Sequence, residues 1–201
     1  MRILHTIGRG STSAGTDALL DLARWQSAQE CRVVLAAPRQ APLFEAARTG
    51  GLAVEPVDLE ARCAGREALF LRAAVRRHGI EVIHAHDEAS SLQALLCADL
   101  CPIVRTLDKA ESTRLAGTND GALAFDHVAV DSAATRDRLV KAELIAAEHV
   151  TVLTGSAEAR LTRLLEAYER AIVRSLTGRL IPARFVAGRP ELRRVTPLAA
   201  E

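Results

Sequence analysis

Lysine and aromatic residues are scarce in this chain of 201 residues. Only Lys109 and Lys141 are lysines, and aromatic side chains make up 3% of the sequence. Arginine supplies almost all of the positive charge. The 26 lysines and arginines are balanced by 25 acidic residues, which leaves a net charge of +1. A nucleic-acid-binding protein normally carries a clear basic excess, so this balance argues against nucleic acid as a partner.

Long apolar segments are also missing. No apolar run approaches the ~20 residues that span a bilayer. The chain starts Met1-Arg2-Ile3-Leu4-His5, and the apolar region and cleavage site of a signal peptide do not follow. We therefore expect a cytoplasmic protein with at most a peripheral contact to a membrane.

The four cysteines are scattered and form no Cys-x-x-Cys pair. This pattern fits reduced thiols better than a framework of disulfides. Cys97 and Cys101 lie four residues apart and could share one face of a helix, but no second pair of ligands accompanies them. We therefore expect them to pack in the core rather than to bind zinc.

Short apolar runs alternate along the chain with segments of helical spacing. The runs predicted as strands are Arg2–Ile7, Cys31–Ala37, Leu52–Leu59, Glu81–His86, Ile103–Leu107, Asp126–Asp131 and His149–Leu153. Helices are predicted from Thr16, over Pro42–Thr49, over Arg66–His78 with Gly79 as its stop, over Glu88–Ala98, from an N-cap at Ser132 through Val140, and over Ser156–Leu176.

Strands that read as continuous apolar runs between helices indicate a parallel sheet that is covered on both faces. We therefore predict an α/β fold: a doubly wound, Rossmann-like parallel sheet of six or seven strands with the first strand central. Residues 1–155 would form this domain. Residues 156–178 would form a long helix that packs back on it through a stripe of Leu161, Leu164, Leu165, Tyr168, Ile172 and Leu176. Residues 179–201 would be a loose basic tail.

A doubly wound sheet binds its ligand outside the carboxyl ends of the strands, here between the first and the fourth. Two segments converge there: the loop from Gly8 to Gly15 and the end of the fourth strand. A glycine-rich turn allows close backbone approach to a ligand, and the start of the following helix favours an anion. The alternative is that these glycines only form a turn.

Two histidines stand at the end of the fourth strand. We expect His84 and His86 to point to opposite faces of the strand, so that one of them is a core histidine. His86 ends the strand and precedes Asp87 and Glu88, and it is the candidate for an exposed role in proton transfer. The alternative is a purely structural histidine at the end of a strand.

A dinucleotide site is a competing interpretation of the same loop. Residues 8–13 begin as Gly-x-Gly-x-x, but Ser13 stands where the third glycine of the fingerprint belongs. No acidic residue follows the second strand, where Pro38 and Arg39 stand instead. Arg39 could face the 2′-phosphate of NADP, so an NADP-binding enzyme is kept as a further hypothesis.

Several segments together resemble one known family. Ala14-Gly15-Thr16-Asp17 is similar to a Gly-Gly-x-Glu turn, and Val82 to His86 resembles a strand ending in His-x-His. Ile103–Thr106, Val128–Ser132 and Val150–Leu153 match later strands in order and spacing. These segments resemble the N-terminal domain of glycosyltransferase family 4, whose members have the GT-B fold. The resemblance runs from Met1 to about Gly155. It departs from the family at Ala14, where the first glycine of the turn is replaced.

The resemblance implies transfer of a sugar from a nucleotide-sugar co-substrate to a saccharide or lipid-linked acceptor, with no metal or other cofactor. It implies His86 as the catalytic residue near the reacting centre. The turn at Ala14, Gly15 and Thr16 would face the donor phosphates or the acceptor, and Arg105 would also bind substrate. By the same analogy we expect a role in cell-envelope polysaccharide synthesis, in the cytoplasm or at the inner face of the membrane.

Members of this family carry a second domain of similar size that binds the nucleotide-sugar, and 201 residues cannot hold it. We therefore expect little activity from this chain alone, and a donor-domain partner or a homodimer to cover its open face. The alternative is a non-catalytic subunit that binds the acceptor or another protein.

Overall fold

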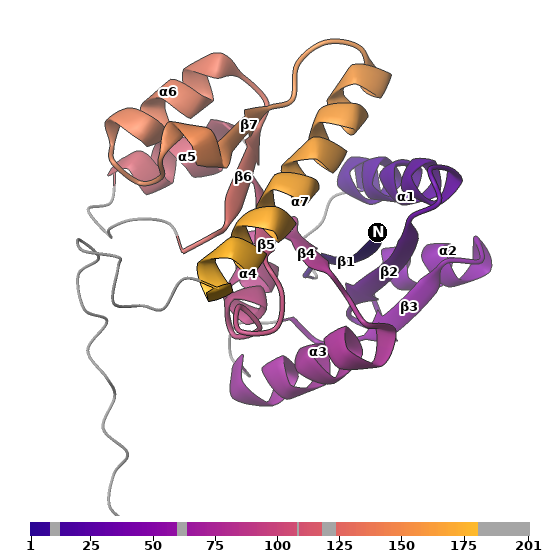
Figure 1. Ribbon diagram of the computed structural model, residues 1–201. Coiled ribbons are helices and arrows are strands. Elements are labelled where there is room, and N and C mark those ends of the chain that lie inside the picture. The colour runs from indigo at the N-terminus through magenta and orange to yellow at the C-terminus, as the bar shows by residue number, and fades with distance from the viewer. Residues whose placement is uncertain (9–12, 60–63, 108, 118–123, 181–201) are drawn as a thin grey trace, which may run out of the picture.

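The computed structural model describes residues 1–8, 13–59, 64–107, 109–117 and 124–180 (Figure 1). Within these residues a single parallel sheet has the strand order β3-β2-β1-β4-β5-β6-β7. Its strands are β1 Arg2–Thr6, β2 Arg32–Ala37, β3 Ala53–Pro56, β4 Val82–Ala85, β5 Ile103–Leu107, β6 His127–Val130 and β7 Val150–Val152. The chain winds outward in one direction through β2 and β3, and in the other from β4 to β7. This confirms the predicted doubly wound α/β fold with β1 near the centre.

Helices cover both faces of the sheet. One face carries α1 (Ser13–Ala28), α2 (Pro42–Thr49) and α7 (Ala157–Leu180), whereas the other carries α3 (Ala64–His78), α4 (Glu88–Leu95), α5 (Lys109–Gly117) and α6 (Ala133–Lys141). A short 3₁₀ helix, η2 (Ala147–His149), precedes β7. Figure 1 shows α7 running across β4, β5 and β6.

The central strands are buried on both sides because their side chains alternate between two apolar layers. Ile3, Val82 and Val104 pack under α7. Their neighbours in sequence, Leu4 and Ile83, pack on the opposite face against α3 and α4. A polar side chain on one of these strands is therefore held in the interior, where it needs a hydrogen-bonding partner.

Several elements differ from the sequence prediction. Helix α5 was not predicted, because its sequence KAESTRLAG is polar and lacks an apolar period. Strand β3 is shorter than predicted, at the edge of the sheet. Leu176, expected in the stripe of α7, is 56% exposed, whereas Ala167 and Ala171 are fully buried, so small residues seat this helix on the sheet.

Other predictions are confirmed. Gly79 ends α3 with a φ of 59°, in the left-handed region that favours glycine. Ser132 caps α6 by accepting a hydrogen bond from the backbone N–H of Thr135. Cys97 and Cys101 are buried in the core. None of the described helices is long and apolar enough to cross a membrane. From residue 181 on, the predicted tail lies outside the described residues.

Candidate functional site

The two segments expected to converge meet at the carboxyl ends of β1 and β4. The backbone N–H of His86 donates to the carbonyl of Thr6 at 3.1 Å, which extends the ladder one residue beyond β4. Asp87 follows and caps α4 by accepting from the N–H of Ser90. Its second carboxylate oxygen accepts from the N–H of Gly8. The first residue of the glycine loop is therefore tied to the end of β4.

The expectation that His84 and His86 face opposite ways is wrong. Residues two apart on a strand share a face, and their ring centroids lie 4.0 Å apart. His5 of β1, which pairs in register with His84, joins them on the side covered by α1 and α7. Its centroid lies 5.2 Å from that of His84 and 5.1 Å from that of His86. The site is therefore a cluster of three histidines, the histidine cluster, in which His86 is half-buried and the other two are buried.

Burial keeps all three rings neutral. It lowers the pKa of His5 to about 4, although the hydrogen bond with Gln26 opposes this shift. The pKa values of His84 and His86 lie well below the ordinary value, chiefly because burial disfavours the cation, and further because the neighbouring histidines and Arg105 are cationic or can become so. A neutral imidazole has one N–H and one lone pair, so each ring both donates and accepts.

A chain of hydrogen bonds begins at His86 and leads into the interior. His86 Nε2 lies 2.8 Å from His5 Nδ1. His5 Nε2 lies 2.7 Å from Gln26 Oε1 on α1. His5 and Gln26 are fully buried. No partner of His86 Nδ1 is recorded among the described residues, so this nitrogen is the open end of the chain.

The same chain continues beyond Gln26 to α7 and β5. Gln26 Nε2 donates to the hydroxyl of Tyr168 at 3.2 Å. This hydroxyl lies 2.6 Å from His84 Nδ1, and His84 Nε2 lies 2.6 Å from Thr106 Oγ1. Tyr168 is fully buried, and burial raises the pKa of its hydroxyl, which therefore stays protonated.

The histidine cluster also has the spacing of a metal site. One ring nitrogen from each histidine lies within 4.8 Å of the others. Both nitrogens of His5 and of His84, however, take part in hydrogen bonds with protein groups. A cation held by all three rings would break several of these bonds and would add positive charge close to Arg105. The arrangement is therefore better suited to hydrogen bonding and proton transfer than to coordination.

The other residues predicted to bind substrate are placed differently. Ala14, Gly15 and Thr16 lie in the first turn of α1, which begins at Ser13, so the last residues of the predicted loop, Ser13 to Gly15, are helical. The Thr16 side chain is buried, and the side chain of Ala14 lies outside the described residues. Arg105 is 1% exposed, forms an ion pair with Glu111 of α5 and donates to the carbonyl of Ala85. Its guanidinium supports the end of β4 from the opposite face, and its contact with substrate stays a prediction.

Sequence reasoning did not single out His5, Gln26 or Tyr168 as members of a site. The signal for Gln26 was present, because it falls on the buried stripe of α1 with Leu19 and Ala23, where an amide needs partners.

A family comparison addresses what such a domain does. The model of Glycosyltransferase Family 4 matches residues 18–156, more than half of the chain. The chain belongs to Glycosyltransferase Family 4. The matched residues contain β2 to β7, and they include His84, His86 and Gln26. The resemblance found in the sequence is thereby confirmed. No curated protein matches the chain in a sequence search.

Solved structures agree on the fold. A glycosyltransferase from Rickettsia africae has a TM-score of 0.58 at 10% identity, over 84% of this chain and 49% of that one. Anabaena HepE in complex with UDP-glucose has a TM-score of 0.57 at 14% identity, over 83% and 50%. MurG of Acinetobacter baumannii has a TM-score of 0.54 at 11% identity, over 77% and 46%. This chain therefore spans about half the length of these proteins, and the likeness shows the GT-B type of domain.

Proposed function

We propose that this domain forms the acceptor side of a sugar-transfer site in which His86 receives the acceptor hydroxyl. One observation carries the proposal: a neutral, half-buried histidine stands at the carboxyl ends of β1 and β4, with its Nε2 held by His5 and with no partner for its Nδ1 among the described residues. Family membership supplies the reaction class. The crevice beside this strand end is where doubly wound domains bind their ligands.

In the proposed reaction, the acceptor hydroxyl donates a hydrogen bond to His86 Nδ1. Its oxygen forms the new bond to the anomeric carbon of the nucleotide-sugar, and the bond from that carbon to the diphosphate oxygen breaks. The hydroxyl proton passes to Nδ1, and the nucleoside diphosphate leaves with the bonding electron pair. General base catalysis of this kind typically contributes ~10²–10⁴-fold to a rate.

The nucleotide-sugar requires a second wall. Holding a donor against an acceptor can supply ~7–11 kcal/mol of a barrier, and this requires both sides of a cleft. The start of α1 near Thr16 offers an anion the N-terminus of a helix, but an exposed contact of that kind typically contributes ~0.3–1 kcal/mol. We therefore place most donor binding on a second domain, in the same protein or in a partner, or in a second copy that covers the same face.

The acceptor and the setting follow from family analogy. We propose a saccharide or lipid-linked acceptor of the cell envelope, and a place of action in the cytoplasm or at the inner face of its membrane.

The test is binding of saccharide acceptors and of UDP- and GDP-sugars to the purified chain, measured by calorimetry. We expect an acceptor from an array of envelope saccharides to bind, and His86→Ala to weaken that binding at least tenfold. His78→Ala, a histidine outside the histidine cluster that bonds to Glu55, should leave it unchanged. Nucleotide-sugars alone should bind weakly and give no turnover.

Three results would favour other functions. Micromolar nucleotide-sugar binding with turnover by this chain alone would show a self-sufficient enzyme. Acceptor binding that is indifferent to His86 would favour a non-catalytic subunit. NADP binding that is lost in Arg39→Ala would support the dinucleotide hypothesis, in which the exposed Arg39 after β2 faces the 2′-phosphate.

A further inference from the structure

The hydrogen-bond chain through the histidine cluster has a direction, and one residue determines it. An amide side chain presents an oxygen that only accepts and a nitrogen that only donates. Gln26 points its Oε1 at His5 and its Nε2 at Tyr168. Each histidine in the chain, by contrast, could play either role at either nitrogen. The orientation of the amide therefore determines which ring nitrogen of His5 carries a hydrogen and toward which group the Tyr168 hydroxyl donates.

The consequence for the active end can be followed one bond at a time. Gln26 Oε1 must receive a proton donor, so His5 carries its hydrogen on Nε2. Because His5 is neutral, its Nδ1 is a bare acceptor, and the 2.8 Å contact then requires the hydrogen of His86 to lie on Nε2. His86 Nδ1 is left with an unshared lone pair.

The other branch obeys the same rule. Gln26 Nε2 donates to the Tyr168 oxygen, so the Tyr168 hydroxyl hydrogen is free to be given to His84 Nδ1. His84 then carries its hydrogen on Nε2 and donates to Thr106 Oγ1. Every bond in the chain is satisfied, which is what buried polar groups require.

Rotation of the Gln26 amide by half a turn would reverse every donor in the chain. His5 would donate from Nδ1, and His86 would be left with a hydrogen on its outer nitrogen. A histidine of that tautomer can donate to a ligand but cannot take a proton from it. Thus the orientation of an amide inside the domain decides whether the outer nitrogen of His86 acts as a base.

We infer that Gln26 is a positioning residue that fixes His86 in the Nε2–H tautomer through His5, while the amide nitrogen of Gln26 donates to Tyr168 of α7. The inference rests on the proposed function for its catalytic meaning, since only a proton-accepting role makes the tautomer matter. It adds the arrangement of base and orienting group that activated sites share, here built from His86, His5 and Gln26. It also gives α7 a part in the site, because the Tyr168 hydroxyl accepts from Gln26 and lies 2.6 Å from His84 Nδ1.

The test is the tautomer of His86, read from the ¹⁵N shifts of its ring in protein labelled at histidine. Ring protons are correlated with both nitrogens at pH 7, and the six histidines are assigned with single variants. We expect a protonated Nε2 and an unprotonated Nδ1 for His86. The same pattern is expected for His5 and His84. A protonated Nδ1 on His86 in the wild-type chain would overturn the inference.

Variants at position 26 separate positioning from folding. Gln26→Leu removes the acceptor of His5, and the ring signals of His5 and His86 should move toward an average of both tautomers. Gln26→Glu keeps an oxygen toward His5 and should restore the wild-type pattern for both rings. Gln29→Leu, at an exposed glutamine just after α1, is the matched control and should change nothing. Unchanged tautomers in folded Gln26→Leu would also overturn the inference.

The acceptor assay distinguishes this inference from the proposed function. We expect Gln26→Leu to weaken acceptor binding about tenfold, and Gln26→Glu to recover most of it. If the tautomer pattern holds but no saccharide binds, the proposed function fails and the assignment of Gln26 stands. If acceptor binding depends on His86 but is the same in Gln26→Leu, the proposed function stands and the role of Gln26 fails.

Discussion

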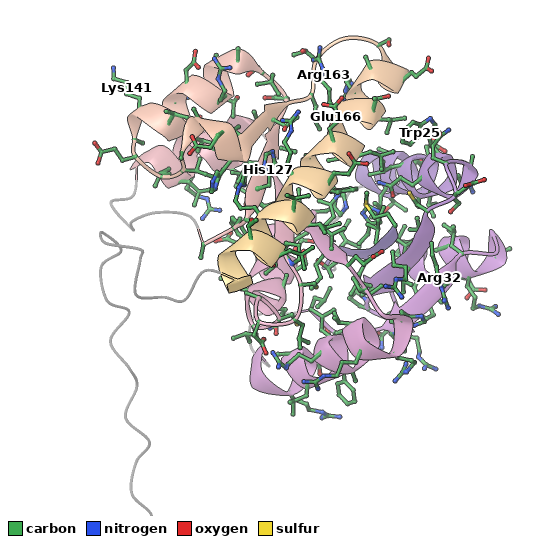
Figure 2. The ribbon with its side chains drawn as sticks, in the orientation of Figure 1. Trp25, Arg32, His127, Lys141, Arg163 and Glu166 are labelled. Atoms are coloured by element: carbon green, nitrogen blue, oxygen red, sulfur yellow. The ribbon has the colours of Figure 1, made fainter. Side chains whose placement is uncertain are left out.

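The same pair of residues, a histidine bonded to a threonine, occurs twice in the part of the sheet from β4 to β7. His84 of β4 bonds to Thr106 of β5, and His127 of β6 bonds to Thr151 of β7, in each case from Nε2 to Oγ1, at 2.6 Å and 2.8 Å. Both histidines lie level with Val104, and both pairs sit under α7. Figure 2 shows His127 on β6 beside this helix.

What differs is the other nitrogen of each ring. His84 Nδ1 accepts a hydrogen bond from the hydroxyl of Tyr168. Through Tyr168 it is connected to the rest of the hydrogen-bond chain, which ends at His86. His127 Nδ1 is buried and has no partner among the described residues. The first pair therefore belongs to a network that reaches His86 at the carboxyl end of β4, whereas the second is a local contact of two strands. A buried histidine bonded to a threonine is thus not evidence of a functional site by itself. The evidence lies in what its second ring nitrogen bonds to.

Acid should destabilise both regions, and this is the largest effect we expect. Burial lowers the pKa of His5 and of His127 to about 4, from an ordinary value of 6.5. The unfolded chain therefore binds protons here that the folded chain refuses, so stability is complete above pH 6.5 and is lost as the pH falls toward 4. Between pH 7 and pH 5 each of the two histidines should cost about 2 kcal/mol, or about 4 kcal/mol together.

Urea denaturation at pH 7 and pH 5 measures this loss. His84 and His86 act in the same direction, because their pKa values are also lowered. His127→Gln keeps a donor toward Thr151 and removes one titrating ring, so it should lose about 2 kcal/mol less than the wild type on acidification. Equal stability of the wild-type chain at the two pH values would contradict the neutral state assigned to these rings.

Removing each histidine–threonine pair should reveal a smaller difference in stability between the two regions. His127→Leu with Thr151→Val deletes both partners together and leaves no buried group unpaired, so its cost should be small. His84→Leu with Thr106→Val leaves the Tyr168 hydroxyl without its acceptor. This second double variant should be less stable than the first by about 1–3 kcal/mol at pH 7.

The measurement is again urea denaturation, with Tyr168→Phe added to the variant that lacks His84 and Thr106. That addition removes the stranded hydroxyl, although Gln26 Nε2 then loses its acceptor. If the two double variants are equally stable, the network confers no more stability than the isolated pair, and the difference between the regions is one of position only.

The fold could be predicted because the central strands can be recognised from the sequence. β1, β4 and β5 each contain two adjacent apolar residues, such as Ile3 and Leu4, that must be buried on opposite faces, and alternation with helices leaves a parallel sheet as the solution. Helix α5 was missed because its residues are mostly polar and it packs chiefly through a few contacts such as Leu115. The periodicity of apolar residues does not predict a helix that is stabilised mainly by packing against its neighbours.

The site was predictable only in part for a similar reason. The topology rule places His86 at the crevice from sequence alone, because it follows from strand order. Gln26 and Tyr168 are separated by 142 residues and meet only when α7 folds back over the sheet. Helical spacing reveals that each is buried, but no spacing reveals that they bond to each other. Tyr168 therefore reads as one more apolar residue of its stripe.

A last comparison concerns the residues that follow the two strands. Asp87 after β4 and Ser132 after β6 are both N-caps, and each accepts from the backbone N–H three residues on. Asp87 also accepts from Gly8 N–H, a bond across 79 residues that Ser132 has no counterpart for among the described contacts. Asp87 thus caps α4 and also holds the start of the glycine loop, whereas the described contacts of Ser132 lie within its own helix.

Ser132→Ala should therefore cost about 1 kcal/mol, the usual value of a lost cap, and Asp87→Ala about 1 kcal/mol more because a second donor loses its acceptor. Asp87→Asn separates the two contributions: its oxygen can still cap α4 by accepting from Ser90, while its amide nitrogen cannot accept from Gly8. Hydrogen exchange of the Gly8 amide should accelerate in Asp87→Asn to the same extent as in Asp87→Ala, while the amide of Ser90 stays protected only in the asparagine variant. Protection of Gly8 that persists in both variants would mean that the loop is held by other contacts. The end of β4 would then differ from the end of β6 in its histidine cluster and not in its cap.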